Sequence, residues 1–174
     1  MHLNFVALAA MLAAGGCGGG TGSDEQVTRS RTVSGPGFTF SAPADRELAR
    51  TPRSVTVLPV DEASQELQSV TRFPLIKPYR PSLWQAAAAE LDGVAERLAA
   101  SLGGEYGAEP QTVRRGGLRG RLYLIRYERD GAELSQRLTL LLSRRTEYQL
   151  LCRWEGSGAA PAACTQLETS FRLR

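Results

Sequence analysis

Apolar and polar residues alternate over two stretches early in the chain, at Gly37–Pro43 and Ser54–Val60, and again at Leu67–Phe73. Alternation with a period of two is typical of β-strands that bury one face. Pro59 marks the end of the second stretch or an edge position, because proline cannot donate a hydrogen bond to a neighbouring strand. The pattern therefore predicts three strands in the first half of the chain.

A helical period follows this alternation. Apolar residues recur at three- and four-residue spacing from Trp84 to Leu102, which predicts a helix with one apolar stripe. Ser82 and Gln85 match a capping box at its start, and the glycine pair at 103–104 matches a helix end. About 20 residues at 1.5 Å each make a helix about 30 Å long, enough to cross a sheet.

The second half of the chain predicts an antiparallel meander. Strands at Arg119–Arg129 and Ala132–Arg144 are joined by Asp130-Gly131, the preferred pair for a type I′ hairpin turn. A last strand is predicted at Tyr148–Trp154, and a short helix from Pro161. One face of the hairpin has Tyr123, Ile125, Tyr127, Leu134, Leu138, Leu140 and Leu142, and the other has Leu122, Leu124 and Leu141. Both faces are apolar, so we expect both to be covered.

The order of these elements is strands, a long helix, a three-stranded meander and a short helix. Together with the opening Gly37–Pro43 and the ending Cys164–Phe171, it resembles the PsbP-like α/β/α fold of many bacterial envelope lipoproteins. The resemblance covers residues 36–174. It implies an α+β fold with an antiparallel sheet of about six strands, on which a long helix and a short C-terminal helix pack. A fold alone supplies no catalytic residues.

The first residues of the chain resemble the export signal of a bacterial lipoprotein. The apolar run Leu3–Ala14 has the length of a secretory signal and is too short to span a bilayer, which needs about 20 apolar residues. Cys17 follows this run, and the polar segment Gly18–Gln26 reads as a flexible coil. We expect a signal peptide at 1–16, lipid attachment at Cys17, a tether at 17–34 and a single domain at 35–174.

Two departures from that signal leave alternatives open. Ala14 stands where lipoproteins usually have leucine, and Met1-His2 contains no lysine or arginine. An ordinary signal peptide that is cut nearby, or a start codon placed upstream of the true signal, would also fit.

Two cysteines remain if Cys17 is lipidated. Cys152 and Cys164 form an even pair in an oxidising compartment, where disulfides persist. Cys152 shares a strand face with Trp154, and Cys164 shares a helix face with Leu167, so both sulfurs point to one interface. We predict a disulfide between them, and the alternative is two buried free thiols.

Composition argues against several kinds of catalysis. The only histidine, His2, lies in the predicted signal, so the mature chain has no Ser-His-Asp arrangement and no histidine zinc site. Glu90, Asp92 and Glu96 lie on the predicted long helix, whereas a glycosidase pair must face across a cleft. We therefore expect no enzyme activity, no cofactor and no metal.

Arginine dominates the charge of the chain. Lys77 is the only lysine, so 20 of the 21 basic residues are arginine, and the net charge is +3. Arg114–Arg121 resembles one copy of the arginine-glycine box of RNA-binding proteins, but it runs directly into a predicted strand. Its glycines predict a turn, and an exported protein meets no nucleic acid. A basic surface in the envelope can meet anionic lipid or polysaccharide.

These observations predict a lipid-anchored, non-catalytic accessory or binding module with a protein partner in the cell envelope. Tyr79, Arg80 and Trp84 lie where aromatic residues meet a proline-broken loop and form the candidate binding site, although Trp84 also fits the core. The alternatives are an envelope enzyme that acts on glycan or lipid through carboxylates, and a basic module that binds anionic surfaces.

Overall fold

The computed structural model describes residues 29–61 and 63–174, which form an α+β fold with ten strands and two α-helices. The strands are β1 Ser30–Gly35, β2 Phe38–Pro43, β3 Leu48–Arg50, β4 Ser54–Val57, β5 Leu67–Pro74, β6 Glu105–Arg115, β7 Leu118–Arg129, β8 Ala132–Leu142, β9 Thr146–Glu155 and β10 Arg172–Leu173. The helices are α1 Trp84–Ser101 and α2 Ala162–Ser170, and the 3-10 turn η1 Pro81–Leu83 precedes α1.

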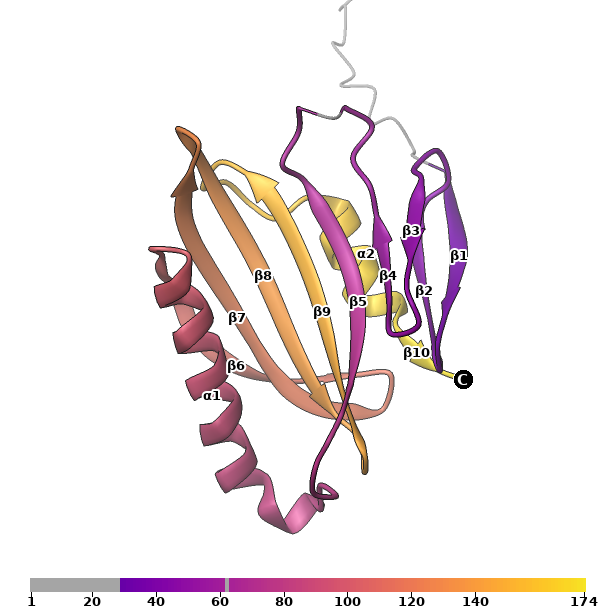
Figure 1. Ribbon diagram of the computed structural model, residues 1–174, viewed down its shortest axis with the longest axis vertical. Helices are drawn as coiled ribbons and strands as arrows, with labels where there is room; N and C mark the ends of the chain where they lie inside the picture. The colour runs from indigo at the N-terminus through magenta and orange to yellow at the C-terminus, as the bar shows by residue number, and fades with distance from the viewer. Residues whose placement is uncertain (1–28, 62) are drawn as a thin grey trace, which may run out of the picture.

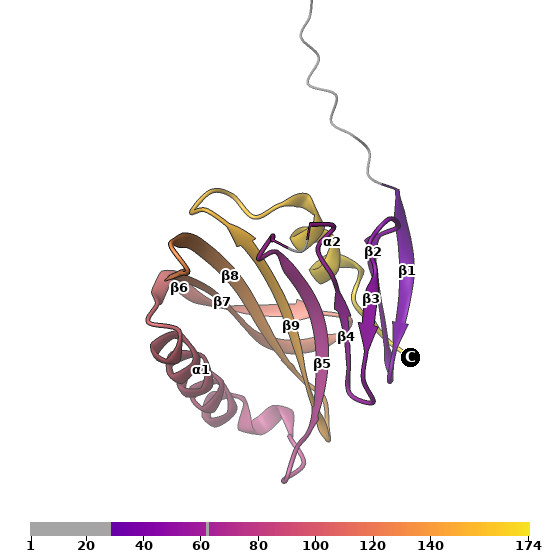
Figure 2. The same ribbon diagram turned by 45° about the horizontal axis from the view of Figure 1, so that its top comes forward.

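All strand pairs are antiparallel and form two sheets. The large sheet has the order β3-β4-β5-β9-β8-β7-β6, and the small sheet has the order β1-β2-β10. In Figure 1 the helix α1 lies on one face of the large sheet, while α2 and the small sheet lie on the other, and Figure 2 shows the same layers. The expected fold class is confirmed.

Each face of the large sheet has its own buried core. The core under α1 consists of Trp84, Leu91, Ala95, Ala99, Tyr123, Ile125, Tyr127, Leu134, Leu138, Leu140 and Leu142. The core on the other face includes Phe38, Phe40, Val70, Leu141, Leu150, Trp154, Leu167 and Phe171. The predicted division of the hairpin into two apolar faces is confirmed, and both faces are covered.

The β7–β8 hairpin has the predicted turn. Asp130 and Gly131 both have positive φ, at 52° and 77°, as a type I′ turn requires. Further along β7, Gly120 lies opposite Leu141, and an added Cβ there would come within 2.0 Å of the Leu140 carbonyl oxygen. β7 and β8 approach closely at this point because Gly120 has no side chain.

The N-terminal boundary of the domain lies earlier than predicted. Residues 30–34, which were placed in the tether, form most of β1 and pair with β2, and Val33 is buried. A single apolar residue in a polar segment gives no alternation to detect, and pairing with β2 supplies the hydrogen bonds. Residues 17–28 of the predicted tether, which include Cys17, and the predicted signal peptide lie outside the described residues.

The strand count also differs from the sequence prediction of about six. β3 and β10 have only three and two residues, too few to show a period. β6 was missed because its pairing with β7 shifts register twice, between Tyr106 and Gln111, which disrupts alternation. β4 ends at Val57, before Pro59, and so is shorter than predicted.

The predicted capping box at Ser82 is wrong. The helix α1 begins at Trp84, its N-cap residue is Leu83, and no side chain caps it. Pro81 begins helical geometry one turn earlier, as a 3-10 turn in which the backbone N–H of Leu83 donates to the carbonyl oxygen of Arg80 (2.9 Å). Ser82 therefore lies inside this turn and not at the cap position.

The predicted disulfide is present. Cys152 of β9 and Cys164 of α2 are joined, with their Cα atoms 5.5 Å apart, and both residues are buried. The bond fixes α2 to the face of the large sheet opposite α1.

Replacing both Cys152 and Cys164 by alanine is expected to lower the free energy of unfolding by about 3 kcal/mol, because the bond closes a short loop in the unfolded chain. Urea denaturation measures this loss. Dithiothreitol should lower the stability of the wild-type chain by a similar amount and leave the double variant unchanged. An unaltered wild-type midpoint after reduction would contradict the prediction.

Candidate functional site

A pocket of about 520 Å³ lies where the turn η1, the β6–β7 turn and the end of β8 meet, toward the lower end of the molecule in Figure 1. Three segments distant in sequence form its walls: the residues before α1, the β6–β7 turn and the residues after β8. We call it the arginine pocket. Its lining residues are Tyr79, Arg80, Pro81, Arg114, Gly117, Leu118, Arg119, Leu142, Ser143 and Arg144.

The β6–β7 turn supplies two of the four arginines. Gly116 and Gly117 have positive φ, at 54° and 80°, and form a two-residue turn that joins the strands. Gly116 also lies against Phe171, whose carbonyl oxygen would be 2.9 Å from an added Cβ. This turn makes Arg114 and Arg119 direct cross-strand partners.

The loop before α1 supplies the third arginine and positions the fourth. The backbone N–H groups of Leu75 and Tyr79 donate to the carbonyl oxygens of Arg145 (2.9 Å) and Arg144 (2.8 Å), respectively. These two bonds fasten the β5–α1 loop to the β8–β9 turn. Arg80 and Arg144 therefore line the same pocket.

The four guanidinium groups of the arginine pocket have no acidic partner. Within the described residues none of them takes part in an ion pair, whereas Arg115, Arg121 and Arg137 elsewhere each pair with a carboxylate. No carboxylate lines the pocket. Like charges directly opposite on paired strands, as at Arg114 and Arg119, cost roughly 0.2–1 kcal/mol. A bound anion would offset this repulsion.

The remaining wall of the pocket is mainly apolar, formed by Leu118, Leu142, Pro81 and the ring of Tyr79. Guanidinium groups bind carboxylate and phosphate with two parallel hydrogen bonds. Cations beside an apolar wall fit an anionic group that is attached to an apolar body. The geometry therefore favours an amphipathic anion.

The sequence-predicted site residues divide between the pocket and the core. Tyr79 and Arg80 line the pocket, while Trp84 is buried in the core under α1. The guanidinium carbon of Arg119 lies 4.0 Å from the centre of the Trp84 ring. Trp84 therefore contacts a pocket arginine through a cation–π interaction.

Three further pocket arginines were not assigned to this site from the sequence. Arg114 and Arg119 belong to the arginine-glycine segment, whose predicted turn is confirmed and whose clustering was the available signal. Arg144 gave no signal, because only the fold brings the end of β8 beside the β6–β7 turn.

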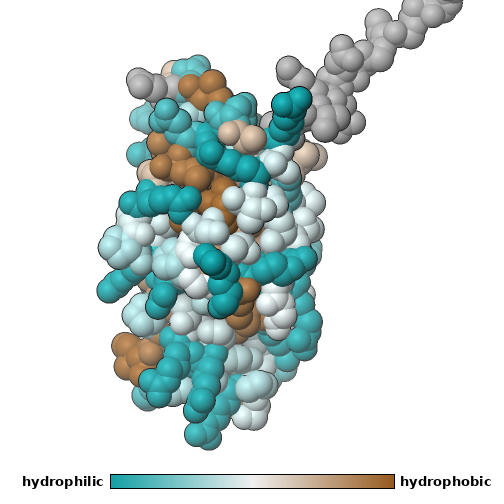
Figure 3. Space-filling view, turned by 90° about the vertical axis from the view of Figure 1, so that its right-hand side faces the viewer, coloured by the Kyte–Doolittle hydropathy of each residue, from teal (hydrophilic) through white to brown (hydrophobic). Residues whose placement is uncertain are grey.

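Two other cavities each contain a carboxylate that pairs with arginine. A cavity of about 420 Å³ next to the arginine pocket holds Glu168, which pairs with Arg115 (3.2 Å), and Arg137 also pairs with Glu168 (3.5 Å). A larger cavity of about 750 Å³ lies beside the disulfide, and its Arg46 and Glu66 pair at 3.6 Å. On the side of the molecule with the small sheet, Figure 3 shows one hydrophobic patch in the upper half and smaller hydrophobic spots lower down, among hydrophilic side chains.

The candidate carboxylates on α1 do not form a facing pair. Glu90 and Glu96 are exposed, and Asp92 binds Arg121 of β7 through two hydrogen bonds of 2.8 and 3.1 Å. The hydroxyl of Tyr123 donates to Asp92 as well (2.7 Å). Burial, followed by this hydrogen bond, raises the pKa of Tyr123, so its hydroxyl remains protonated and a donor. Asp92 fastens α1 to the sheet.

Replacing Asp92 by alanine is expected to lower the free energy of unfolding by about 2 kcal/mol, because charge-assisted hydrogen bonds to Arg121 and Tyr123 are lost. Chemical denaturation measures the change. Glu96→Ala on the same helix is the matched control and should change stability by less than about 0.5 kcal/mol. Equal effects of the two substitutions would contradict the structural role of Asp92.

Across residues 29–61 and 63–174, no three His, Cys, Asp or Glu side chains are grouped so that they could hold a metal ion. Neither of the described α-helices is long and apolar enough to span a membrane.

No known family and no curated protein matches the sequence. Two solved structures resemble the fold. One is a chain from Bacteroides thetaiotaomicron VPI-5482, with a TM-score of 0.54 and 10% identity over 81% of this chain and 47% of that one, so this chain spans about half of its length. The other is LpqN of Mycobacterium tuberculosis, described as involved in cell envelope biogenesis, with a TM-score of 0.50 and 14% identity over 83% and 90% of the two chains. At these identities the similarities show that this chain shares its fold with both proteins.

Proposed function

We propose that this protein is a lipid-anchored, non-catalytic binding module of a bacterial cell envelope, and that it holds an anionic partner in the arginine pocket. The observation that carries the proposal is the pocket itself. Four arginines without acidic partners in the described structure line it, beside an apolar wall. Binding an anion would relieve their repulsion, which gives the site a direct reason for affinity.

Three observations support the envelope location. The residues before Cys17 have the layout of a lipoprotein export signal, and the fold resembles that of LpqN, an envelope biogenesis protein. The Cys152–Cys164 disulfide suits an oxidising compartment.

Intact-mass analysis of the membrane fraction tests the anchor: acyl groups on Cys17 are expected, and a mature chain without them would contradict it.

The chemistry of the reactive groups supports a non-catalytic role. Both Cys152 and Cys164 are consumed by the disulfide, and Asp92 and Glu168 are each held by arginine. The single histidine of the sequence, His2, precedes Cys17 and is lost if the chain is cut there. The proposal therefore assigns these groups to stability and assigns the unpaired arginines to binding.

An anionic fluorescent probe tests the arginine pocket. The dye 8-anilinonaphthalene-1-sulfonate combines a sulfonate with aromatic rings and becomes fluorescent in apolar surroundings. Arg114→Gln together with Arg144→Gln is expected to weaken its binding roughly tenfold or more, because charge-assisted hydrogen bonds are lost. Both side chains are exposed, so the fold should persist.

Arg97→Gln is the matched control, because Arg97 is an exposed arginine of α1 about 20 Å along the helix from Trp84. It should leave dye binding unchanged. Decyl phosphate and decanoate should displace the dye, whereas decyl maltoside, a neutral molecule with the same alkyl chain, should not. Equal dye binding by the pocket variant and the control, or equal displacement by the neutral competitor, would overturn the proposal.

A further inference from the structure

Apolar side chains project from the loop between β5 and α1. Ile76 is 100% exposed, Leu83 is 52% exposed, and Phe73 at the end of β5 is 40% exposed. We call Ile76 and Leu83 the apolar tip. In Figure 3 the lower end of the molecule has hydrophobic surface directly beside hydrophilic side chains.

The apolar tip stands on a firmly held loop. Leu75 and Tyr79, on either side of Ile76, are bonded through their backbones to the β8–β9 turn and pack against the core under α1. Pro78 and Pro81 further restrict the backbone of the segment that leads into α1. The loop thus presents Ile76 outward in a fixed place, and the described residues give that side chain no neighbour to pack against.

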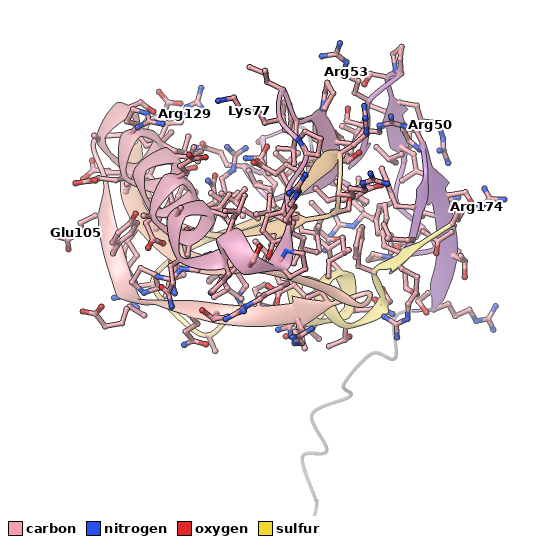
Figure 4. The ribbon with its side chains drawn as sticks, turned by 90° about the horizontal axis from the view of Figure 1, so that it is seen from below. Arg50, Arg53, Lys77, Glu105, Arg129 and Arg174 are labelled. Carbon is pink, nitrogen blue, oxygen red and sulfur yellow. A yellow bond between two sulfur atoms is a disulfide. The ribbon has the colours of Figure 1, made fainter. Side chains whose placement is uncertain are left out.

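Basic residues lie on the loop of the apolar tip and on the turn bonded to it. Lys77 follows Ile76 and points away from the molecule in Figure 4, while Arg80, Arg144 and Arg145 lie on the same loop or on the turn bonded to it. No acidic residue occurs between Glu66 and Glu90 in the sequence. Glu147 lies opposite Phe73 in the sheet, and burial raises its pKa.

We infer that this end of the molecule docks on an anionic lipid bilayer, with Ile76 and Leu83 inserted at the boundary between head groups and acyl chains. The inference rests on the proposed function, since it identifies the anion of the arginine pocket as a lipid head group. Aliphatic side chains that project singly among long cationic ones match the interface of an anionic membrane. A protein partner would instead require a broad complementary surface.

Vesicle sedimentation tests the docking surface with the unacylated chain from Gly18 onward, which contains every described residue. The vesicles are phosphatidylcholine with or without phosphatidylglycerol. Ile76→Ser is expected to lower the partition constant on anionic vesicles roughly tenfold, because the apolar contact is lost. Val60→Ser is the matched control: Val60 is 69% exposed but lies in the loop after β4, at the other end of the molecule, and its loss should change nothing.

A second pair of variants tests the charge. Lys77→Gln is expected to weaken binding to anionic vesicles severalfold, whereas Arg97→Gln on α1 should not. An Ile76→Trp variant reports insertion, since lipids with brominated acyl chains should quench its added fluorescence. Equal binding of Ile76→Ser and Val60→Ser, equal binding to neutral and anionic vesicles, or an unquenched tryptophan at position 76 would each overturn the inference.

Dye binding distinguishes this inference from the proposed function. If the pocket variant loses the anionic dye but Ile76→Ser binds vesicles as well as wild type, membrane docking is refuted and the anion pocket stands. If the pocket variant keeps the dye, the proposed function fails and the inference that rests on it fails too.

Discussion

The β7–β8 hairpin has two apolar faces, and each face must be removed from water. Tyr123 and Ile125 face α1, while Leu124 and Leu141 face α2 and the small sheet. Full burial of one such side chain is worth about 1.5–3 kcal/mol, so an uncovered face would cost more than a small domain can lose. The rest of the chain is arranged to cover both faces: α1 on one side, and β1, β2 and α2 on the other.

This covering requirement also builds the arginine pocket. The chain leaves β5 in the sheet and must pass around the lower end of the sheet before α1 can cross the face. The crossing segment is bonded to the β8–β9 turn and passes beside the β6–β7 turn, so Arg80, Arg114 and Arg144 come together although they are distant in sequence. The ion pair between Asp92 and Arg121 then fixes α1 in place. The pocket is thus a consequence of how the core is closed.

Strong local patterns made much of this architecture predictable. Three features depend only on neighbouring residues: the alternation in β2, β5 and β8, the helical stripe of α1, and the Asp130-Gly131 turn. All three lie where the sequence predicts them. The disulfide was predictable because both cysteines lie on apolar faces that point to one interface. The turn at Gly116-Gly117 was predictable for the same local reason.

The features that the sequence did not reveal depend on distant partners. β1 forms because its backbone pairs with that of β2. The irregular β6 forms because its backbone pairs with that of β7. Ser82 fails as a cap because Pro81 starts the helical turn early. The meeting of Arg144 with Arg114 and Arg119 needs the complete sheet order, which no local period specifies. Two residues of the candidate site, Tyr79 and Arg80, were predicted from the sequence because a proline-broken loop marks them.

The central claim is that unpaired arginines at one end of the fold bind an anion together. Side-chain Nε–Hε resonances of arginine, recorded by NMR during a titration with decyl phosphate, test this claim most directly. We expect Arg80, Arg114, Arg119 and Arg144 to shift and saturate with one common dissociation constant, while Arg53 and Arg97 remain unchanged. Weak shifts spread evenly over all exposed arginines, without saturation, would contradict it.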